Sequence, residues 1–279
     1  MARELAPLVV GATITEAWTD WPAAVRHPDP TGYRVALAGR TIVGVRRRAK
    51  WLVADLDQGA LVIQVKMTGQ LSVVPADSPL DRHVHATWTF ADGRQMRLRD
   101  VRKFARIGAY EADALAIALA QHGPEPLEAG FTLAAFRRRL RARRARLKPL
   151  LLDQAFLAGV GNIYADEALW RSRLHPLRHA GTLRPPDERR LYGAIRGILA
   201  EAIERRGSSI NDYTAPEGDG EMQEHLDVYQ RTGLPCHRCG RPVRRMVIGA
   251  RGTHFCSWCQ RLPAAERDAA ARRLLHVAG

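Results

Sequence analysis

The sequence predicts an α+β protein with more than one domain, because its hydrophobic pattern changes once and its cysteines gather near one end. Alternating apolar residues and turn signals, which are typical of β-strands, fill the chain to about Tyr110. From about Glu111 the apolar residues recur with a helical period, and all four cysteines follow residue 235. The 279 residues suffice for two domains of ordinary size.

Residues 1–121 are expected to form an antiparallel two-sheet β-sandwich. The stretches "YRVAL" (33–37) and "LVIQVKM" (61–67) alternate apolar and polar positions, as half-buried strands do. "ADGR" (91–94) predicts a hairpin with a two-residue type I′ turn, since Asp-Gly tolerates positive φ. Lys50 falls in register with Leu52 and Ala54, so we expect it on a strand.

Residues 122–230 are expected to form a helical domain, entered through the linker "HGPEPLEAG". Thr132 is a candidate cap for the basic helix that follows. "KPLLLDQAFLAGVGNIYADEALWRSRL" reads as a helix, a tight glycine turn and a second helix, a helix–turn–helix-like unit. A further helix runs from Pro186 to a stop at Gly207, and residues 263–279 read as a tail containing a short Ala/Arg-rich helix.

The charge favours a polyanionic partner. The formal net charge is +14, and "RRRLRARRARLK" (137–148) holds eight positive residues and no acid. A solvated helix face normally interleaves Glu with Arg, so we favour nucleic acid over a solvated face or a membrane surface. No apolar run reaches the roughly 18 residues of a membrane helix, and we see no signal peptide. We therefore expect a cytosolic protein that does not bind membranes.

The cysteines predict one structural zinc site. Cys236-x2-Cys239 and Cys256-x2-Cys259 are separated by sixteen residues, and two such pairs close a tetrahedron around Zn²⁺. Disulfides and a redox Cys-x2-Cys are the alternatives; a cytosolic setting disfavours the first and the paired spacing the second. The stretch between the pairs is basic and suggests a hairpin presented to phosphates or bases.

Several motifs together resemble one family. "AKWL", "KMTGQL", "DVRKF", "LKPLLLDQ", "GVGNIYADEAL", "VYQRTGLPC" and "ARGTHFC" occur in this order. This set closely resembles bacterial formamidopyrimidine-DNA glycosylases, nearly throughout the chain up to Gln260. The related endonuclease VIII enzymes share the architecture, but "MTGQL" and "VRKF" are more similar to the formamidopyrimidine branch. The resemblance implies a β domain, a helix–two-turn–helix domain and a zinc finger at residues 231–262, with damaged duplex DNA as partner.

The resemblance implies a wedge that fills the hole left by a flipped nucleotide. It maps onto Met67, Arg102 and Phe104. From the alternation alone Met67 would be a core residue in phase with Ile63 and Val65.

The resemblance implies further roles that the residue pattern alone leaves open. Lys50 would act in β-elimination, although a surface lysine beside three arginines is the plain alternative. Arg251 would grip phosphates and serve δ-elimination, and Glu167 would be an active-site carboxylate, where the pattern shows only an ordinary helix residue. Asn162 is either a phosphate ligand or a helix cap. The other implied DNA-binding positions are His83, Arg143 and Tyr229, and 207–229 matches a loop that closes over the damaged base.

The resemblance also implies an N-terminal proline nucleophile, followed by a Glu. In this chain "MARELAPLVVGATI" reads as a helix that ends at Gly11 and lacks a capping side chain at its start, and no proline follows Met1. We expect the true start to lie some nine codons upstream.

Three functional hypotheses remain. The first is a monomeric glycosylase and AP lyase of the bacterial nucleoid that excises 8-oxoguanine and formamidopyrimidines, with the preference among lesions left open. The second is a catalytically inactive relative that binds damaged DNA. The third, a basic zinc ribbon of RNA or transcription machinery, does not explain "GVGNIYADE" or "VRKF".

Overall fold

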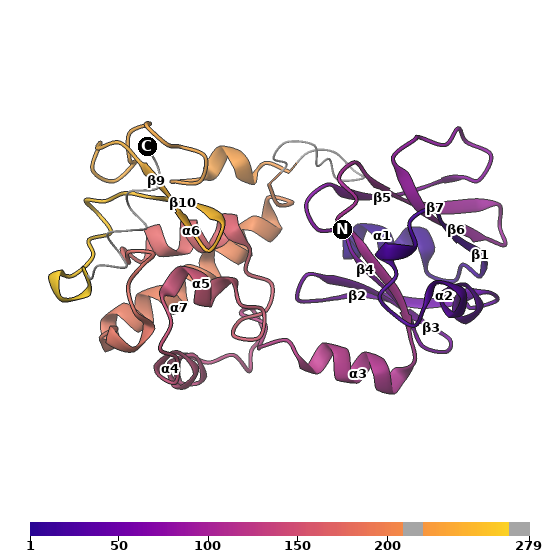
Figure 1. The fold of residues 1–279 in the computed structure, drawn as a ribbon, viewed down its shortest axis with the longest axis horizontal. Helices are drawn as coiled ribbons and strands as arrows, with labels where there is room; N and C mark the ends of the chain where they lie inside the picture. The colour runs from indigo at the N-terminus through magenta and orange to yellow at the C-terminus, as the bar shows by residue number, and fades with distance from the viewer. Residues whose placement is uncertain (209–219, 268–279) are drawn as a thin grey trace. The chain divides into compact units, whose positions relative to one another are not determined.

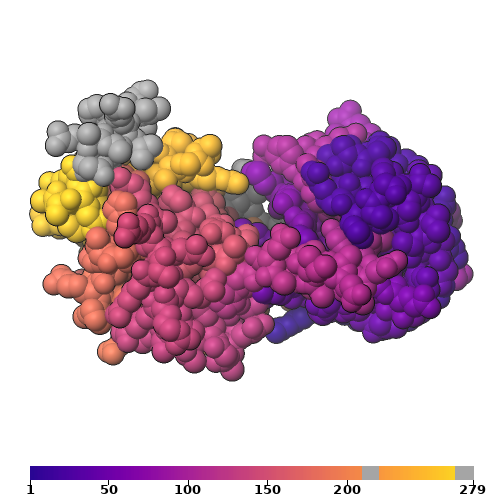
Figure 2. Space-filling view, turned by 60° about the horizontal axis from the view of Figure 1, so that its bottom comes forward, coloured from indigo at the N-terminus to yellow at the C-terminus, as the bar shows by residue number. Residues whose placement is uncertain are grey.

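The computed structural model describes residues 1–208 and 220–267 (Figure 1). Met1–Gln121 forms one compact unit, and His122–Gly207 with residues 221–267 belongs to a second. The space-filling view shows one face of each unit (Figure 2). The α+β prediction is confirmed. Residues 209–219 of the predicted closing loop at 207–229, and residues 268–279 of the tail, lie outside the described residues.

The first unit is built on two four-stranded antiparallel sheets. One sheet has the order β1-β6-β7-β5, with strands Ile14–Thr19, Val84–Phe90, Arg94–Asp100 and Gly69–Pro75. The other has the order β2-β3-β4-β8, with strands Ile42–Arg48, Trp51–Leu56, Ala60–Gln64 and Arg106–Tyr110. The predicted two-sheet architecture is therefore confirmed.

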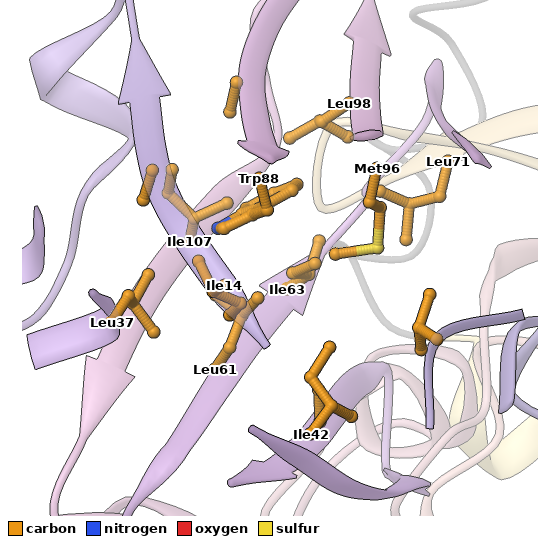
Figure 3. Packing of buried hydrophobic residues seen from close by; sticks show 14 of the residues in the cluster. Ile14, Leu37, Ile42, Leu61, Ile63, Leu71, Trp88, Met96, Leu98 and Ile107 are labelled. Atoms are coloured by element: carbon orange, nitrogen blue, oxygen red, sulfur yellow. The ribbon is translucent and has the colours of Figure 1, made fainter. Parts of the chain in front are cut away.

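Side chains from both sheets meet in one core (Figure 3). Ile14 and Trp88 come from the first sheet, Leu61 and Ile63 from the second, and all are at most 1% exposed. The short helix α1 (Ala2–Val9) adds Leu5 and Val9 to the same core. Helix α3 (Ala112–Ala120) contributes Leu115 to a smaller cluster with Val53 and Val62 on the second sheet.

The prediction of a strand at "YRVAL" is wrong: residues 30–37 form helix α2 (Pro30–Leu37). Asp29 caps its first turn by accepting hydrogen bonds from the Thr31 and Gly32 amides at 2.9 and 3.0 Å. Tyr33 and Leu37, four residues apart, are buried, and the Tyr33 hydroxyl accepts a hydrogen bond from the Trp88 indole at 2.8 Å. Over only five residues, spacings of two and four are compatible with either element.

The predicted hairpin at 91–94 is confirmed, but not its turn type. Strands β6 and β7 are joined by three residues, and of these only Gly93 has positive φ, at 82°. A type I′ turn needs positive φ at both central residues. Instead the Gly93 amide donates to the Phe90 carbonyl at 3.1 Å, and the Asp92 carboxylate accepts from the Arg94 amide at 3.0 Å.

The second unit contains the predicted helices. They are α4 (Leu133–Arg141), α5 (Leu147–Leu152), α6 (Asn162–Arg171) and α7 (Pro185–Glu204). The Thr132 hydroxyl caps α4 by accepting from the Ala135 amide at 3.2 Å, as expected. Gly159, with φ of 83°, lies in the turn between α5 and α6.

The basic run 137–148 is not a uniformly solvated or DNA-facing surface. Arg137 and Arg141 both pair with the buried Glu188 on α7, at 3.0 and 2.7 Å. Lys148 is fully buried and pairs with Asp166. The balancing acids are distant in sequence, so the local composition concealed them.

The zinc-binding segment forms a β-hairpin, as predicted. Strands β9 (Arg244–Ile248) and β10 (Arg251–Phe255) pair antiparallel, and Gly249 and Ala250 form its tip with positive φ. Beyond it, Ala264–Glu266 form one turn of 3₁₀-helix.

Helix α1 has no side-chain hydrogen bond at its N-cap and ends before Gly11, whose φ is 88°; both features follow the prediction. Within residues 1–208 and 220–267, no helix has the length and apolar character needed to cross a membrane.

Candidate nucleic-acid interface and zinc centre

The structure brings the three predicted wedge residues together in the first unit. Met67 follows β4 and is 55% exposed, so it is not the core residue that the alternation suggested. The Arg102 guanidinium lies 3.8 Å from the Met67 sulfur and stacks 4.7 Å from the centre of the Phe104 ring. Phe104 is itself 41% exposed. Two loops far apart in sequence therefore present one exposed cluster of an aromatic ring, a thioether and a cation.

Both wedge loops contain strained backbone. Lys66 and Lys103, each next to a wedge residue, have positive φ of 55° and 52°. Such conformations cost on the order of 1–3 kcal/mol in residues other than glycine and gather at functional sites. Gly69 closes the first loop, and a Cβ there would lie 2.3 Å from the Val65 carbonyl oxygen. The glycine of "KMTGQL" is thus required by a close backbone approach.

A fully buried carboxylate, Asp100, holds the two loops together. It accepts hydrogen bonds from the Thr68 hydroxyl and from the Phe104 and Ala105 amides, the latter two at 2.8 and 2.7 Å. Its own amide donates to the carbonyl of His83 at 2.8 Å, which connects that predicted DNA-binding residue to the same anchor. Sequence reasoning missed Asp100, although it is the first residue of "DVRKF".

Lys50 lies in the turn between β2 and β3 and is exposed, so its predicted place on a strand is wrong. The register pairs Leu52 with Ile63, so the start of β3 lies beside the end of β4. The turn that contains Lys50 and the loop that contains Met67 therefore lie at the same end of the sheet. Burial lowers the pKa of Lys66 there, and the nearby Arg106 and Arg26 guanidiniums lower it further. This end of the sheet therefore carries a concentrated positive potential that attracts anions.

In the second unit, a buried ion pair fixes the start of α6. The Lys148 ammonium lies 2.5 Å from Asp166 and also donates to the Asn162 carbonyl at 2.9 Å. Burial lowers the pKa of Lys148, and the Asp166 carboxylate opposes that shift. The other Asp166 oxygen accepts from the His254 amide on β10 at 3.0 Å. The turn before α6 is thereby tied to the zinc hairpin.

Predicted phosphate-binding residues cluster around this junction. Asn162 is the first residue of α6, and its side-chain amide donates to the Gly252 carbonyl on β10 at 3.0 Å. The Tyr229 ring packs edge-on against His254, with centroids 4.9 Å apart. Arg251 is exposed at the start of β10, beside the hairpin tip. Arg143 is exposed just after α4, where its amide donates to the Leu140 carbonyl at 3.1 Å.

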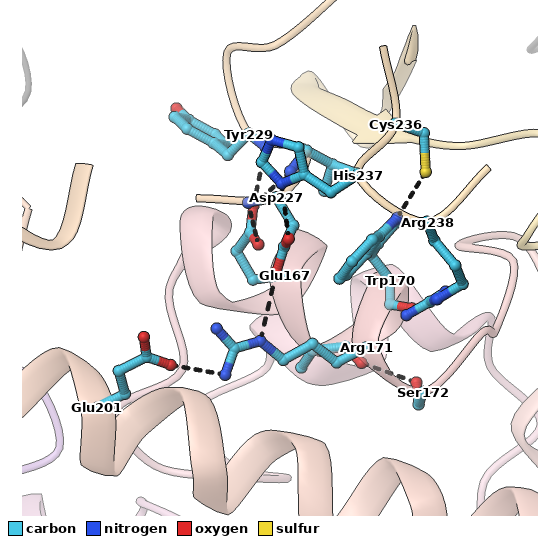
Figure 4. A network of polar contacts seen from close by, with 12 residues as sticks. Glu167, Trp170, Arg171, Ser172, Glu201, Asp227, Tyr229, Cys236, His237 and Arg238 are labelled. Atoms are coloured by element: carbon cyan, nitrogen blue, oxygen red, sulfur yellow. Dashed lines mark hydrogen bonds and ion pairs between the residues drawn. The ribbon is translucent and has the colours of Figure 1, made fainter. Parts of the chain in front are cut away.

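Glu167 occupies a different environment from the one expected of a reactive carboxylate (Figure 4). It is fully buried, and its two oxygens accept hydrogen bonds from three consecutive amides, those of Asp227, Val228 and Tyr229, at 2.8–2.9 Å. Burial raises its pKa, and the three amides oppose this by stabilising the carboxylate. This geometry makes Glu167 the anchor of the segment that carries Tyr229; a catalytic role stays a prediction.

The four cysteines form a structural zinc site. Their sulfur atoms all lie within 4.8 Å of one another, and a tetrahedral site with Zn–S bonds of about 2.3 Å needs separations of about 3.8 Å. Each pair lies on a matching turn, in which the Gly240 or Gln260 amide donates to the carbonyl of the pair's first cysteine at 2.9 Å.

The electrostatics of the thiols also fit a bound cation. Burial raises the pKa of Cys236, but hydrogen bonds, first from the Trp170 indole at 3.4 Å, lower it to about 6. The pKa of Cys259 is raised to about 12, first by burial and then by Cys239 and Cys256. Four thiolates this close repel one another unless a divalent cation lies between them.

These features define a protein of the helix–two-turn–helix class with a structural zinc hairpin. Family models match for the formamidopyrimidine-DNA glycosylase N-terminal domain (residues 1–107), the formamidopyrimidine-DNA glycosylase H2TH domain (122–214) and the zinc finger found in FPG and IleRS (233–262). The chain belongs to the formamidopyrimidine-DNA glycosylase family.

Individual relatives agree with this membership. Formamidopyrimidine-DNA glycosylase of Roseiflexus sp. (strain RS-1) is 45% identical over 263 residues, which cover 93% of this chain and 96% of the relative. MutM in complex with DNA containing carbocyclic 8-oxo-G superposes with a TM-score of 0.87 at 34% identity, covering 94% and 97% of the two chains. The Lactococcus lactis Fpg complex with abasic-site DNA gives 0.87 at 35% identity, with the same coverage.

Replacing Asp100 by alanine should loosen both wedge loops, because three donors lose a buried acceptor. We expect the free energy of unfolding to fall by about 1–3 kcal/mol, measured by urea denaturation. The exposed Asp92→Ala variant is the control and should change stability less. Unchanged stability in Asp100→Ala would contradict the anchoring role.

Removing zinc should unfold the hairpin and abolish DNA binding, since the binding energy of a structural zinc is folding energy. We expect chelation to release one zinc per chain and to eliminate binding to a labelled duplex, followed by fluorescence anisotropy. Retained affinity in zinc-free protein would show that the hairpin folds without its metal.

Proposed function

We propose that this protein is a DNA glycosylase with AP lyase activity that excises 8-oxoguanine and formamidopyrimidines from duplex DNA. The observation that carries the proposal is the convergence of Met67, Arg102 and Phe104 on one exposed cluster. Family membership and solved relatives bound to 8-oxo-G and abasic-site DNA support it.

The wedge has a definite task in this scheme. Flipping a nucleotide out of the stack costs a few kcal/mol, and an inserted side chain recovers part of that by filling the hole. The Met67 thioether and Phe104 ring offer apolar surface to neighbouring bases, and the Arg102 guanidinium is fixed by its stacking on Phe104.

Several polar and basic side chains would bind phosphates. Arg251, Asn162 and Tyr229 gather at the junction of α6 and β10, where the first turn of α6 favours an anion. His83 and Arg143 would add further contacts. We assign Lys50 to β-elimination and Arg251 to δ-elimination, as the family resemblance implies.

The chemistry requires an amine that attacks C1′ of the damaged nucleotide. The N-glycosidic bond breaks, and the base leaves with the bonding electrons and takes up a proton. The secondary amine, such as proline, loses its proton, and the C1′–O4′ bond of the sugar then opens as O4′ takes up a proton, which leaves a cationic iminium. The iminium acidifies the C2′ proton, whose removal expels the 3′ phosphate, and removal of the C4′ proton then expels the 5′ phosphate.

The substrate would place the protein on the chromosome, in the nucleoid of a bacterial cytoplasm. None of the observations favours the inactive DNA-binding alternative. The family assignment removes the reason to consider a transcription-type zinc ribbon.

Trapping with borohydride tests the proposal. One form of the chain begins at Met1, a second form carries a Pro-Glu opening added before Ala2, and each form is incubated with an 8-oxoguanine duplex and borohydride. We expect a covalent adduct from the extended form, visible as a shifted band, because reduction fixes the iminium. An opening with alanine in place of proline is the matched control.

Each outcome of that experiment is informative. Base excision and adduct only in the proline form support the proposed chemistry. An equal adduct from the form that begins at Met1 would assign the nucleophile to another amine, such as Lys50. No excision by either form would contradict the function.

Glu167→Gln separates anchoring from catalysis. A carboxamide cannot accept from all three amides of 227–229, because its nitrogen is itself a donor. We expect weaker binding to an abasic-site duplex, with single-turnover excision at saturating enzyme largely retained. Tyr229→Phe, which keeps the backbone contacts, is the comparison. A hundredfold slower single turnover with unchanged affinity would instead support a reactive carboxylate.

A further inference from the structure

An exposed tryptophan on the zinc module lies between two arginines. The Arg241 guanidinium carbon is 3.4 Å from the centre of the Trp258 ring, and that of Arg261 is 3.9 Å from it. Trp258 is nevertheless 46% exposed. We call these three residues the arginine–tryptophan stack.

The stack joins the two turns that hold the zinc. Arg241 comes two residues after Cys239, Trp258 lies between the cysteines of the second pair, and Arg261 follows that pair. Since a guanidinium covers each face of the indole, a base has no free face on which to stack. What the stack offers to a partner is the N–H groups of two arginines whose planes are fixed in advance. Such arginines bind phosphate in a bidentate manner at a low entropic cost.

The surroundings leave this positive charge unbalanced. Residues 231–267 contain eight arginines and one acid, Glu266. Glu266 is buried, accepts hydrogen bonds from the His179 amide and the Thr182 hydroxyl, and lies 3.7 Å from Arg178, so it is used inside the fold. Arg261 also lines a hollow of about 580 Å³ that contains three more arginines, Arg244, Arg245 and Arg267. The complementary partner is therefore a polyanion.

The stack is separate from the junction of α6 and β10, where Arg251 is proposed to bind phosphates. Arg251, at the start of β10, is five residues before Cys256, which corresponds to about 16 Å along the strand direction. Along B-DNA this distance spans about five base pairs. A duplex held at Arg251 can therefore reach the stack only if it continues well beyond the lesion.

We propose that the arginine–tryptophan stack is a second DNA contact, which binds backbone phosphates of duplex outside the segment around the lesion. It would strengthen the hold on long, mostly undamaged DNA without taking part in excision. The identity of the polyanion rests on the function proposed above; the stack geometry and the charge do not.

The test compares two lesion duplexes, one with about four and one with about twenty base pairs on either side of 8-oxoguanine. The protein is the full chain and its Arg241→Gln/Arg261→Gln double variant. We expect the variant to bind the long duplex more weakly, with a log Kd against log salt slope smaller in magnitude by about 1.8, or about 0.9 per lost phosphate contact. Affinity for the short duplex should be unchanged.

Two matched variants separate the stack from net charge. Arg34→Gln/Arg189→Gln removes the same charge at two exposed positions elsewhere and should leave the slope for the long duplex unchanged. Trp258→Leu keeps both charges but removes the surface that orients them, and should weaken binding to the long duplex only. Zinc content and melting are measured for each variant; if the double variant loses zinc, Arg261→Gln alone carries the test with half the change in slope.

The outcomes distinguish this inference from the proposed function. Equal slopes for the full chain and the double variant on the long duplex overturn the second contact, while binding to the short duplex still supports the proposed function. Equal weakening on both duplexes overturns it too, because the stack would then belong to the lesion site. Failure of the full chain to bind either duplex contradicts the proposed function and, with it, DNA as the partner.

Discussion

The candidate interface depends on buried carboxylates that hold backbone amides. In the first unit, Asp100 accepts hydrogen bonds from both wedge loops. In the second unit, Glu167 accepts hydrogen bonds from the segment that carries Tyr229. A desolvated carboxylate with two or three amide donors is costly to disturb, because each donor would be left unsatisfied. The exposed side chains that are expected to meet DNA therefore project from backbone that is fixed before binding, which reduces the ordering cost of association.

Features set by local spacing were predictable from the sequence. The cysteine pairs, the Thr132 cap and the glycine turn before α6 are each determined by residues within a few positions of one another. The predictions that were wrong concern segments whose side chains are bound by residues far away in the sequence. Tyr33 of the helical segment 33–37 is bound by the Trp88 indole, 55 residues away in sequence, and the basic run 137–148 is balanced by Glu188 and Asp166.

The wedge residues show a second reason why the site could not be predicted from the residue pattern alone. Alternation alone placed Met67 in the core, and only the resemblance placed it with Arg102 and Phe104, which the structure now brings into contact. The sequence could not reveal Asp100 as the anchor, because a carboxylate in an otherwise exposed motif looks like any loop acid. Its role becomes visible only once the Thr68 and Phe104 donors are seen to converge on it.

The zinc site and the segment that carries Tyr229 are connected through residues of α6. Trp170 on α6 donates to Cys236, packs with Val228 and Cys256, and lies three residues from Glu167, which holds the Val228 and Tyr229 amides. The hairpin is tied to α6 again through His254 and Gly252. A zinc ion held by the four cysteines would fix Cys236 against Trp170, while the His254 and Gly252 contacts hold β10 against the start of α6. Together these contacts would position Asn162, Tyr229 and Arg251 relative to one another. Loss of the metal would disperse this cluster even though none of the three residues is a zinc ligand.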